Sequence, residues 1–218
     1  GLFSAQYFGQ KNHNGVRNVF RMKILIGITI IAISISVMIF LHEPLINMFL
    51  HEGSSSGNIQ ETFNYAKNYL YIMVIGIAPF VISNCYNTTL KESGQTVVPM
   101  KAGVLAVVFD IVLNYIFIFG KLGFPAMGVV GAAIATVISR FVECGYLVIY
   151  THIHSNDYPF IKYCYRTLKV PGSLVKKIIV TGAPLMLNEF LWAGGLTLQT
   201  QALSTKGLAT VGGLNICN

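Results

Sequence analysis

Two polar residues interrupt a long apolar stretch in the middle of the chain. Asp110 is the only charged residue between positions 102 and 120, and Asn114 follows it four residues later. In a helix this spacing places both side chains on one face. Because a carboxylate in a membrane helix costs roughly 2.5 to 3.5 kcal/mol to insert, a functional role explains Asp110 better than a structural one. A carboxylate and an amide oxygen are ligands that suit a small cation, so we predict a cation site here.

Glu189 is a second isolated acid in an apolar stretch. Asn188 precedes it and Trp192 follows within two helical turns. Such a carboxylate could hold a proton, a metal cation or an organic cation, and the aromatic ring could contact an organic cation. We therefore assign Glu189 to a coupling site, and Asn188 and Trp192 to a substrate cavity. The alternatives are a structural role for Glu189 and packing of Trp192 against lipid.

Arg140 and Glu143 share another apolar stretch, and their i, i+3 spacing allows them to pair on one helix face. We interpret them as a structural ion pair, with a gating role as the alternative. In the same stretch Gly128, Ala132 and Thr136 recur every four residues, a pattern that permits close packing of a neighbouring helix. Packing is the preferred role for this stripe, although the Thr136 hydroxyl could also face a lumen.

The elements that carry these residues are predicted to cross a membrane. Hydrophobic residues make up 54% of the 218, only 11% are charged, and the mean hydropathy is +0.62. A soluble domain would be about 25% charged. Since about 20 apolar residues span a bilayer as a helix, we predict an all-α membrane protein, a polytopic helical bundle. The five predicted spans are residues 24–41, 68–90, 102–120, 122–150 and 178–203.

Basic residues predict the orientation of these spans. Eleven of them fall before the first span, between the second and third, or between the fourth and fifth: Lys11, Arg17, Arg21, Lys23, Lys91, Lys101, Lys162, Arg166, Lys169, Lys176 and Lys177. The opposite side has only Lys67, Lys121 and Lys206. The first side is therefore predicted to be cytoplasmic. The net charge of +7 then reflects topology, and we expect no nucleic-acid partner.

The four cysteines show no CxxC spacing, so we expect them to be packing residues rather than ligands of a structural metal. No cofactor is expected. The chain starts without a methionine and ends as the apolar residues 208–217 begin, so we expect an internal fragment of a longer protein.

Several segments together resemble the multidrug and toxic compound extrusion (MATE) transporters. They are residues 5–9 (AQYFG), 91–96 (KESGQT) with Pro99 and Met100, 110–115 (DIVLNY) and 123–136 (GFPAMGVVGAAIAT). The resemblance implies a MATE-like fold of twelve helices in two lobes. It places residues 1–150 in the N-terminal lobe, from the end of helix two to helix six. Residues 151–177 would be the cytoplasmic inter-lobe loop, and residues 178–218 helix seven and the start of helix eight.

The resemblance also implies roles for the polar residues. Many members carry Asn and then Asp four residues later on the fifth helix; here the order is reversed, which displaces the carboxylate by one turn. Thr136 resembles a sixth-helix threonine near the same cation site, and Glu189 resembles an acidic position in the second lobe of some members. Sodium at Asp110 and Asn114 is one implied ligand.

The implied function is a secondary active antiporter in the bacterial plasma membrane. It would export cationic or amphipathic drugs in exchange for Na⁺ or H⁺ by alternating access, with the bilayer and the rest of its own chain as partners. A related exporter of lipid-linked or polysaccharide precursors would need a more basic cavity, and a non-transport scaffold would not explain Asp110. An enzyme is disfavoured because the sequence contains no HExxH or paired-Asp motif.

Overall fold

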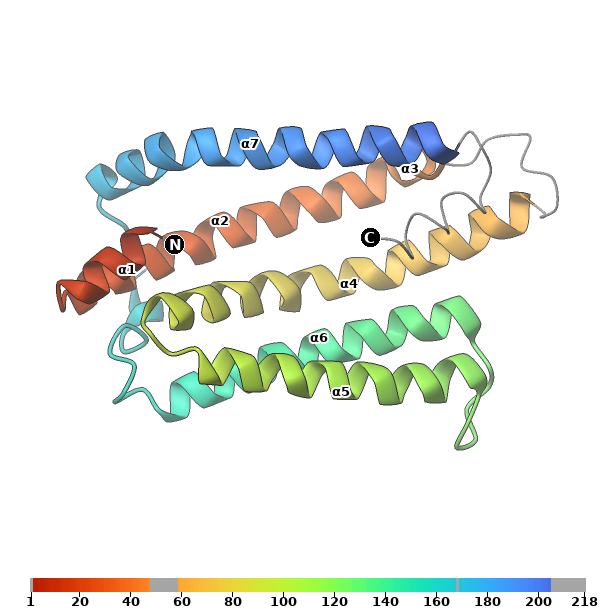
Figure 1. The fold of residues 1–218 in the computed structure, drawn as a ribbon, viewed down its shortest axis with the longest axis horizontal. Coiled ribbons are helices and arrows are strands. Elements are labelled where there is room, and N and C mark those ends of the chain that lie inside the picture. Colours follow the sequence, from red (N-terminus) through yellow and green to blue (C-terminus); the bar gives the residue numbers. More distant parts are fainter. Residues whose placement is uncertain (1, 48–58, 168, 205–218) are drawn as a thin grey trace.

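The structure is a computed structural model that describes residues 2–47, 59–167 and 169–204. Within these ranges the chain forms helices and connecting segments (Figure 1). The elements are α1 (Leu2–Gly9), α2 (His13–Phe40), α3 (His42–Asn47), α4 (Ile59–Glu92), α5 (Val97–Phe119), α6 (Gly128–Ile153), the short 3₁₀ helix η1 (Cys164–Arg166) and α7 (Gly172–Ser204). The predicted all-α fold is therefore confirmed for the described part of the chain.

Four helices are long and apolar enough to cross a membrane: α2, α4 over Phe63–Glu92, α5 and α6. They overlap the first four predicted spans. α7 covers the fifth predicted span as a continuous helix, but it is not among the helices that are apolar enough to cross a membrane. Asn188 and Glu189 lie in its middle and lower its hydropathy.

The fourth predicted span begins too early in the sequence. Residues 121–127 form a loop, and α6 begins at Gly128 rather than at residue 122. Gly120 and Gly123 take positive φ angles of 65° and 86°, which glycine adopts without steric cost. Together with Leu122, whose φ is 56°, these two residues reverse the chain between α5 and α6, a change of direction that apolar composition does not reveal.

The long helices run back and forth, so their ends gather at two ends of the bundle (Figure 1). The start of α2, the end of α4, the start of α5, the end of α6 and the start of α7 meet at one end. This end carries the eleven basic residues assigned to the cytoplasmic side, and we call it the basic end. Lys67 and Lys121 lie toward the opposite end, whereas Lys206 lies outside the described residues.

α6 packs between α4 and α5 and contacts both closely. A Cβ atom added at Gly131 would lie 2.8 Å from the carbonyl oxygen of Phe117 on α5. On the other side, a Cβ atom at Gly76 of α4 would lie 3.1 Å from Val137 Cγ2. The predicted packing stripe was wrong for its first member, because Gly128 is exposed and a Cβ there would meet nothing within 4 Å. The close approach to α5 uses Gly131, and the close approach to α4 places Val137 of α6 against Gly76.

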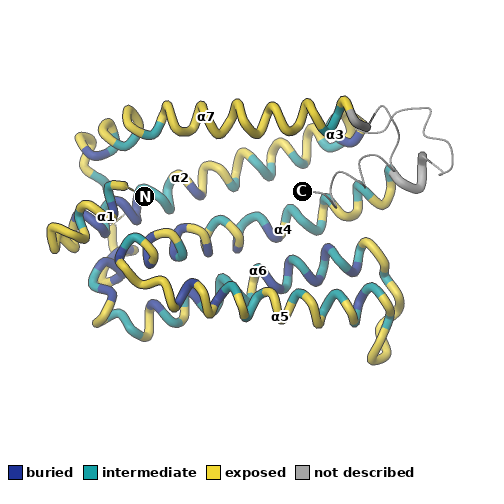
Figure 2. Tube along the Cα trace, in the orientation of Figure 1, coloured by how far each residue is buried: buried dark blue, intermediate teal, exposed yellow. Residues whose placement is uncertain are grey.

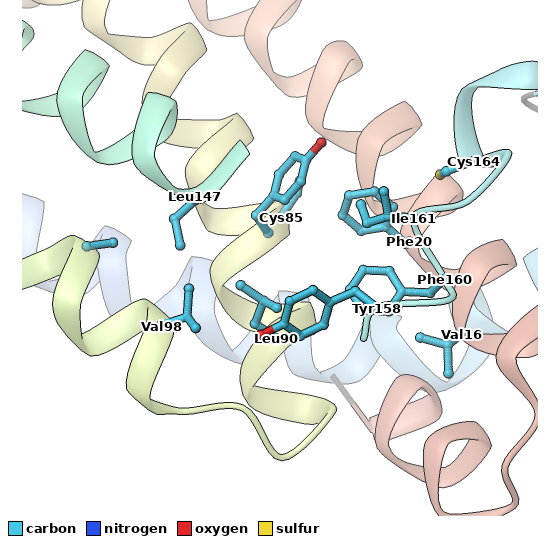
Figure 3. Close-up of a cluster of buried hydrophobic side chains, with 12 residues drawn as sticks. Val16, Phe20, Cys85, Leu90, Val98, Leu147, Tyr158, Phe160, Ile161 and Cys164 are labelled. Carbon is cyan, nitrogen blue, oxygen red and sulfur yellow. The ribbon is translucent and has the colours of Figure 1, made fainter. Parts of the chain in front are cut away.

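The buried core lies at the basic end (Figures 2 and 3). Phe20 of α2 packs edge-on against Tyr86 of α4, with ring centroids 5.1 Å apart. Phe160, from the segment after α6, packs on the same ring of Phe20 at 5.7 Å. Tyr158 is also buried, and burial raises the pKa of its phenol. The core thus joins α2, α4 and the connection toward α7.

Residues 155–167, which we call the docked segment, are held to the bundle by arginines of α2. Arg21 is buried, and it donates from Nε to the Cys164 carbonyl and from Nη2 to the Tyr163 carbonyl, both at 2.8 Å. Arg17 Nη2 donates to the Pro159 carbonyl at 3.1 Å. The sequence predicts this region as an inter-lobe loop; the structure shows that much of it is packed.

α7 lies apart from this core along most of its length. Leu174, near its start, is buried, and Lys177 Nζ lies 5.5 Å from the ring centroid of Phe3 on α1. From Ala183 to Gln199 every residue is exposed (Figure 2). The tertiary structure therefore separates α7 from the residues at α5 and α6.

Candidate functional site

A cleft of about 290 Å³ lies between one face of α5 and one face of α6. Its lining residues recur at helical spacing: Gly103, Ala106, Val107 and Asp110 on α5, and Thr136, Ser139, Arg140 and Glu143 on α6. The small side chains of Gly103 and Ala106 leave this space open. The cleft extends from Asp110 toward the basic end, where α5 begins and α6 ends.

Asp110 is half-buried and accepts hydrogen bonds from neutral groups. Its Oδ2 accepts from Asn114 Nδ2 at 3.1 Å, and its Oδ1 accepts from Ser139 Oγ at 3.4 Å. Ser139 Oγ also lies 2.9 Å from the Ala135 carbonyl, so its single proton is shared between two acceptors. Among the described residues no basic side chain lies within ion-pair distance of Asp110. A visiting cation can therefore supply the missing charge.

Asn114 presents an unsatisfied acceptor beside this carboxylate. Its Nδ2 donates to Asp110, whereas its Oδ1 is buried and has no hydrogen-bond partner. Leaving a buried acceptor unsatisfied costs about 1 to 3 kcal/mol. A small cation that binds the carboxylate and the amide oxygen would relieve this cost, so the donor set fits Na⁺ or a proton carried by water.

Thr136 lines the same cleft, about one helical turn from Ser139 along α6. The structure therefore brings three predicted site residues, Asp110, Asn114 and Thr136, to one region between two helices. Their proximity depends on the register in which α5 packs against α6.

Arg140 and Glu143 also line this cleft, closer to the basic end. The predicted ion pair is present but loose: Arg140 Nη1 lies 4.0 Å from Glu143 Oε2. The Arg140 guanidinium carbon lies 4.3 Å from the ring centroid of Phe80 on α4, a cation–π contact. Arg140 is therefore shared between an acid and an aromatic ring and remains partly exposed to the cleft.

The other three predicted site residues lie elsewhere. Asn188, Glu189 and Trp192 are exposed on α7, and none of them lines the cleft at Asp110. Trp192 keeps 65% of its surface accessible. The structure thus divides the predicted set into one assembled group and one group on an exposed helix.

Ser139 and Phe80 were not singled out by the sequence. Serine and phenylalanine are common in apolar helices, and only the packing of α6 against α5 and α4 shows their contacts. One signal was present: Ser139 follows Thr136 by three residues, so both hydroxyls share a helix face.

Comparison with known proteins agrees with the geometry of these helices. The sequence profile of the MatE family matches residues 2–116, more than half of the chain. This chain belongs to the MatE family. One relative from Thermotoga maritima, named probable multidrug resistance protein NorM, is 30% identical over 97% of this chain. A protein of the same name from Halalkalibacterium halodurans is 29% identical over 95% of it.

A solved structure is also similar to this MatE chain. It is described as the inward-facing conformation of a multidrug resistance MATE family transporter of the MOP superfamily, and it aligns with a TM-score of 0.52 and 26% identity. The alignment covers 68% of this chain and 31% of that protein. The chain spans 43% of the length of each of the two NorM relatives.

Proposed function

We propose that this MatE chain forms part of a secondary active antiporter that exports organic cations or amphipathic drugs. The observation that carries the proposal is Asp110, a carboxylate on a membrane-spanning helix that opens to a cleft and is bonded to neutral groups. Intramembrane acids of this kind mark ion and substrate pathways. The names of the bacterial relatives, probable multidrug resistance proteins, support the choice of cargo.

The proposed coupling ion is Na⁺ or H⁺, and it binds at Asp110 and Asn114 with Thr136 nearby. Cation and drug compete for carboxylates, so loading the cation favours release of the drug on the opposite side. If one monovalent cation enters for each monovalent drug that leaves, the membrane-potential contributions cancel. A tenfold ion gradient then supplies about 1.4 kcal/mol for export.

Glu189 is proposed as a second coupling carboxylate, and Asn188 and Trp192 beside it as parts of a substrate cavity. Its exposure on α7 leaves the carboxylate accessible to further helices of a two-lobe transporter. The proposal places the protein in the bacterial plasma membrane and assigns it no enzymatic activity. A precursor exporter with a basic cavity is less well supported, since the cleft contains two acids and one arginine.

The test is Asp110→Asn in the full-length natural protein, reconstituted in proteoliposomes. Efflux of a fluorescent cationic dye should lose its dependence on the sodium and proton gradients, because the variant removes the charge that attracts the cation. The matched control is Asp157→Asn, which removes the same charge from an exposed position on the docked segment and should keep ion-dependent efflux. Ion-driven efflux by Asp110→Asn at the wild-type rate would refute the proposal.

A further inference from the structure

Arg140 and Glu143 occupy the cleft of Asp110 on the side of the basic end. Glu143 lies four residues after Ser139, the α6 residue that donates to Asp110, which corresponds to about 6 Å along a helix. A cation that leaves Asp110 toward the basic end therefore passes the Glu143 carboxylate. The Glu143 side chain is 15% exposed and Arg140 is 39% exposed, so both retain access to the cleft.

The charges of the cleft sum to −1, because Asp110 and Glu143 each contribute −1 and Arg140 contributes +1. One monovalent cation neutralises this sum. Without Arg140 the two carboxylates would hold a cation more tightly, since both line one partly desolvated cleft, where charges interact more strongly than in water. Tight binding would oppose release of the coupling ion.

Arg140 supplies a fixed positive charge to the cleft but leaves the Glu143 carboxylate able to bind a cation. The 4.0 Å separation between Nη1 and Oε2 is longer than a hydrogen bond, so the Glu143 carboxylate is paired loosely. The ring of Phe80 lies 4.3 Å from the guanidinium carbon at the same time, a second contact that does not depend on Glu143. Arg140 is therefore held in the cleft by Phe80 as well as by Glu143.

We propose that the fixed positive charge of Arg140 sets the affinity of the cleft for the coupling ion. We further propose that Glu143 is a second binding position for this ion, between Asp110 and the basic end, where the ion leaves. This inference rests on the proposed antiport at Asp110. It assigns a functional role to a pair whose spacing alone indicates a structural salt bridge. Arg140 determines how strongly the cleft binds a cation, and the Phe80 ring keeps the guanidinium in place when Glu143 binds the ion.

The test measures dye efflux in proteoliposomes of the full-length protein, in two arms. One arm varies sodium at fixed pH, and the other varies pH without sodium. In the arm that drives efflux, Arg140→Gln should lower the half-saturating cation concentration about tenfold and slow maximal efflux. Arg140→Lys keeps the charge and should stay near wild type. Glu143→Gln should raise the half-saturating concentration about tenfold.

The double variant Arg140→Gln/Glu143→Gln restores the net charge of −1 and should return the half-saturating concentration to within about threefold of wild type. Arg166→Gln is the matched control, because it removes an arginine charge from an exposed position on the docked segment. It should leave both arms unchanged. If Arg140→Gln does not accumulate in the membrane, Glu143→Gln and Arg140→Lys decide the question.

Two results would overturn the inference. One is wild-type cation dependence in both Arg140→Gln and Glu143→Gln; the other is an equal defect in Arg140→Gln and Arg140→Lys, which would show that shape rather than charge matters. Asp110→Asn separates this failure from that of the proposed function. If Asp110→Asn loses ion-driven efflux while the Arg140 and Glu143 variants behave like the wild type, the antiport proposal stands and the proposed role of Arg140 is refuted. If Asp110→Asn keeps ion-driven efflux, the antiport proposal itself is refuted.

Discussion

Asp110 carries a formal charge that its neighbours stabilise but do not neutralise. The amide of Asn114 and the hydroxyl of Ser139 donate to its two oxygens, while the amide oxygen of Asn114 is left buried without a partner. Both features have the same physical consequence, since a cation would satisfy the charge and the acceptor together. The reversed order of acid and amide still places both groups at this point between the helices.

The geometry at Asp110 depends on Gly131, because that residue sets how closely α5 approaches α6. Gly131→Ala should lower the thermal midpoint of the detergent-purified full-length protein and weaken ion-driven efflux. The added Cβ would lie 2.8 Å from the Phe117 carbonyl oxygen, and overpacking of this kind costs about 1 to 3 kcal/mol. Alanine gains only about 1 kcal/mol of helix propensity over glycine.

Gly145→Ala on the same helix is the matched control for this prediction. A Cβ at Gly145 meets nothing within 4 Å, so the thermal midpoint of the Gly145→Ala variant should equal or exceed that of the wild type. Equal midpoints for the two variants would show that α5 and α6 do not pack as described.

At the scale of elements, α2 organises the connection toward α7. Arg21 donates to two consecutive carbonyl groups of the docked segment, and Phe20 packs against Phe160 of the same segment. A buried guanidinium bonded in this way fixes the backbone, because withdrawing it removes the Arg21 donor from the Cys164 carbonyl and leaves the Tyr163 carbonyl with the longer bond from the Arg166 N–H at 3.3 Å. The docked segment is therefore expected to move with α2, α4 and α6 as one body.

Arg21→Gln should release the docked segment and expose Cys164, which is fully buried in the native structure. Burial raises the pKa of the Cys164 thiol, with partial compensation by Arg21, so little thiolate forms at pH 8. Exposure to water brings the pKa back toward its ordinary value. Maleimide labelling of Cys164 at pH 8, followed by mass spectrometry, should therefore accelerate at least about tenfold, consistent with the loss of two charge-assisted hydrogen bonds.

Arg166→Gln again provides the comparison for labelling, because Arg166 is exposed on the same segment. In this variant Cys164 should be labelled at the wild-type rate. In the wild type the labelling rate should rise as the pH approaches the raised pKa of the Cys164 thiol. Slow labelling of Cys164 in Arg21→Gln would show that Arg17 and the aromatic packing hold the segment without Arg21.

At the scale of the whole molecule, charge and shape agree on a single orientation. The helix ends with the basic residues are gathered at one end of the bundle, and the buried core lies at that same end (Figures 1 and 2). The opposite end carries Lys67 and Lys121. Because membranes retain basic loops on the cytoplasmic side, the docked segment should face the cytoplasm.

This orientation predicts the accessibility of two introduced cysteines in intact cells expressing the full-length protein. A membrane-impermeant maleimide should label Lys121→Cys, in the exposed loop between α5 and α6, without permeabilisation. Lys162→Cys, which is exposed on the docked segment, should be labelled only after permeabilisation. The unsubstituted protein gives the background from native cysteines. The reverse labelling pattern would invert the assigned topology.

The sequence by itself determined the medium and the long helices of this protein. Composition and the length of apolar stretches require membrane helices, since backbone groups in a bilayer must be satisfied within each segment. The same reasoning singled out Asp110, because a lone acid in such a stretch is costly. The same reasoning placed the start of α6 too early. The loop before Gly128 is formed by residues with positive φ angles, Gly120 and Gly123 among them, and not by polar residues that a hydropathy pattern would reveal.

Only the tertiary structure decided which side chains meet. The register between α5 and α6 brings Ser139 to Asp110 and places Arg140 and Glu143 in the same cleft, whereas α7 carries Glu189 away from it. Helical periodicity assigns a residue to a face of its own helix but does not say which helix that face contacts. That choice follows from close packing at Gly131 and Gly76, where the absence of a side chain lets two backbones approach.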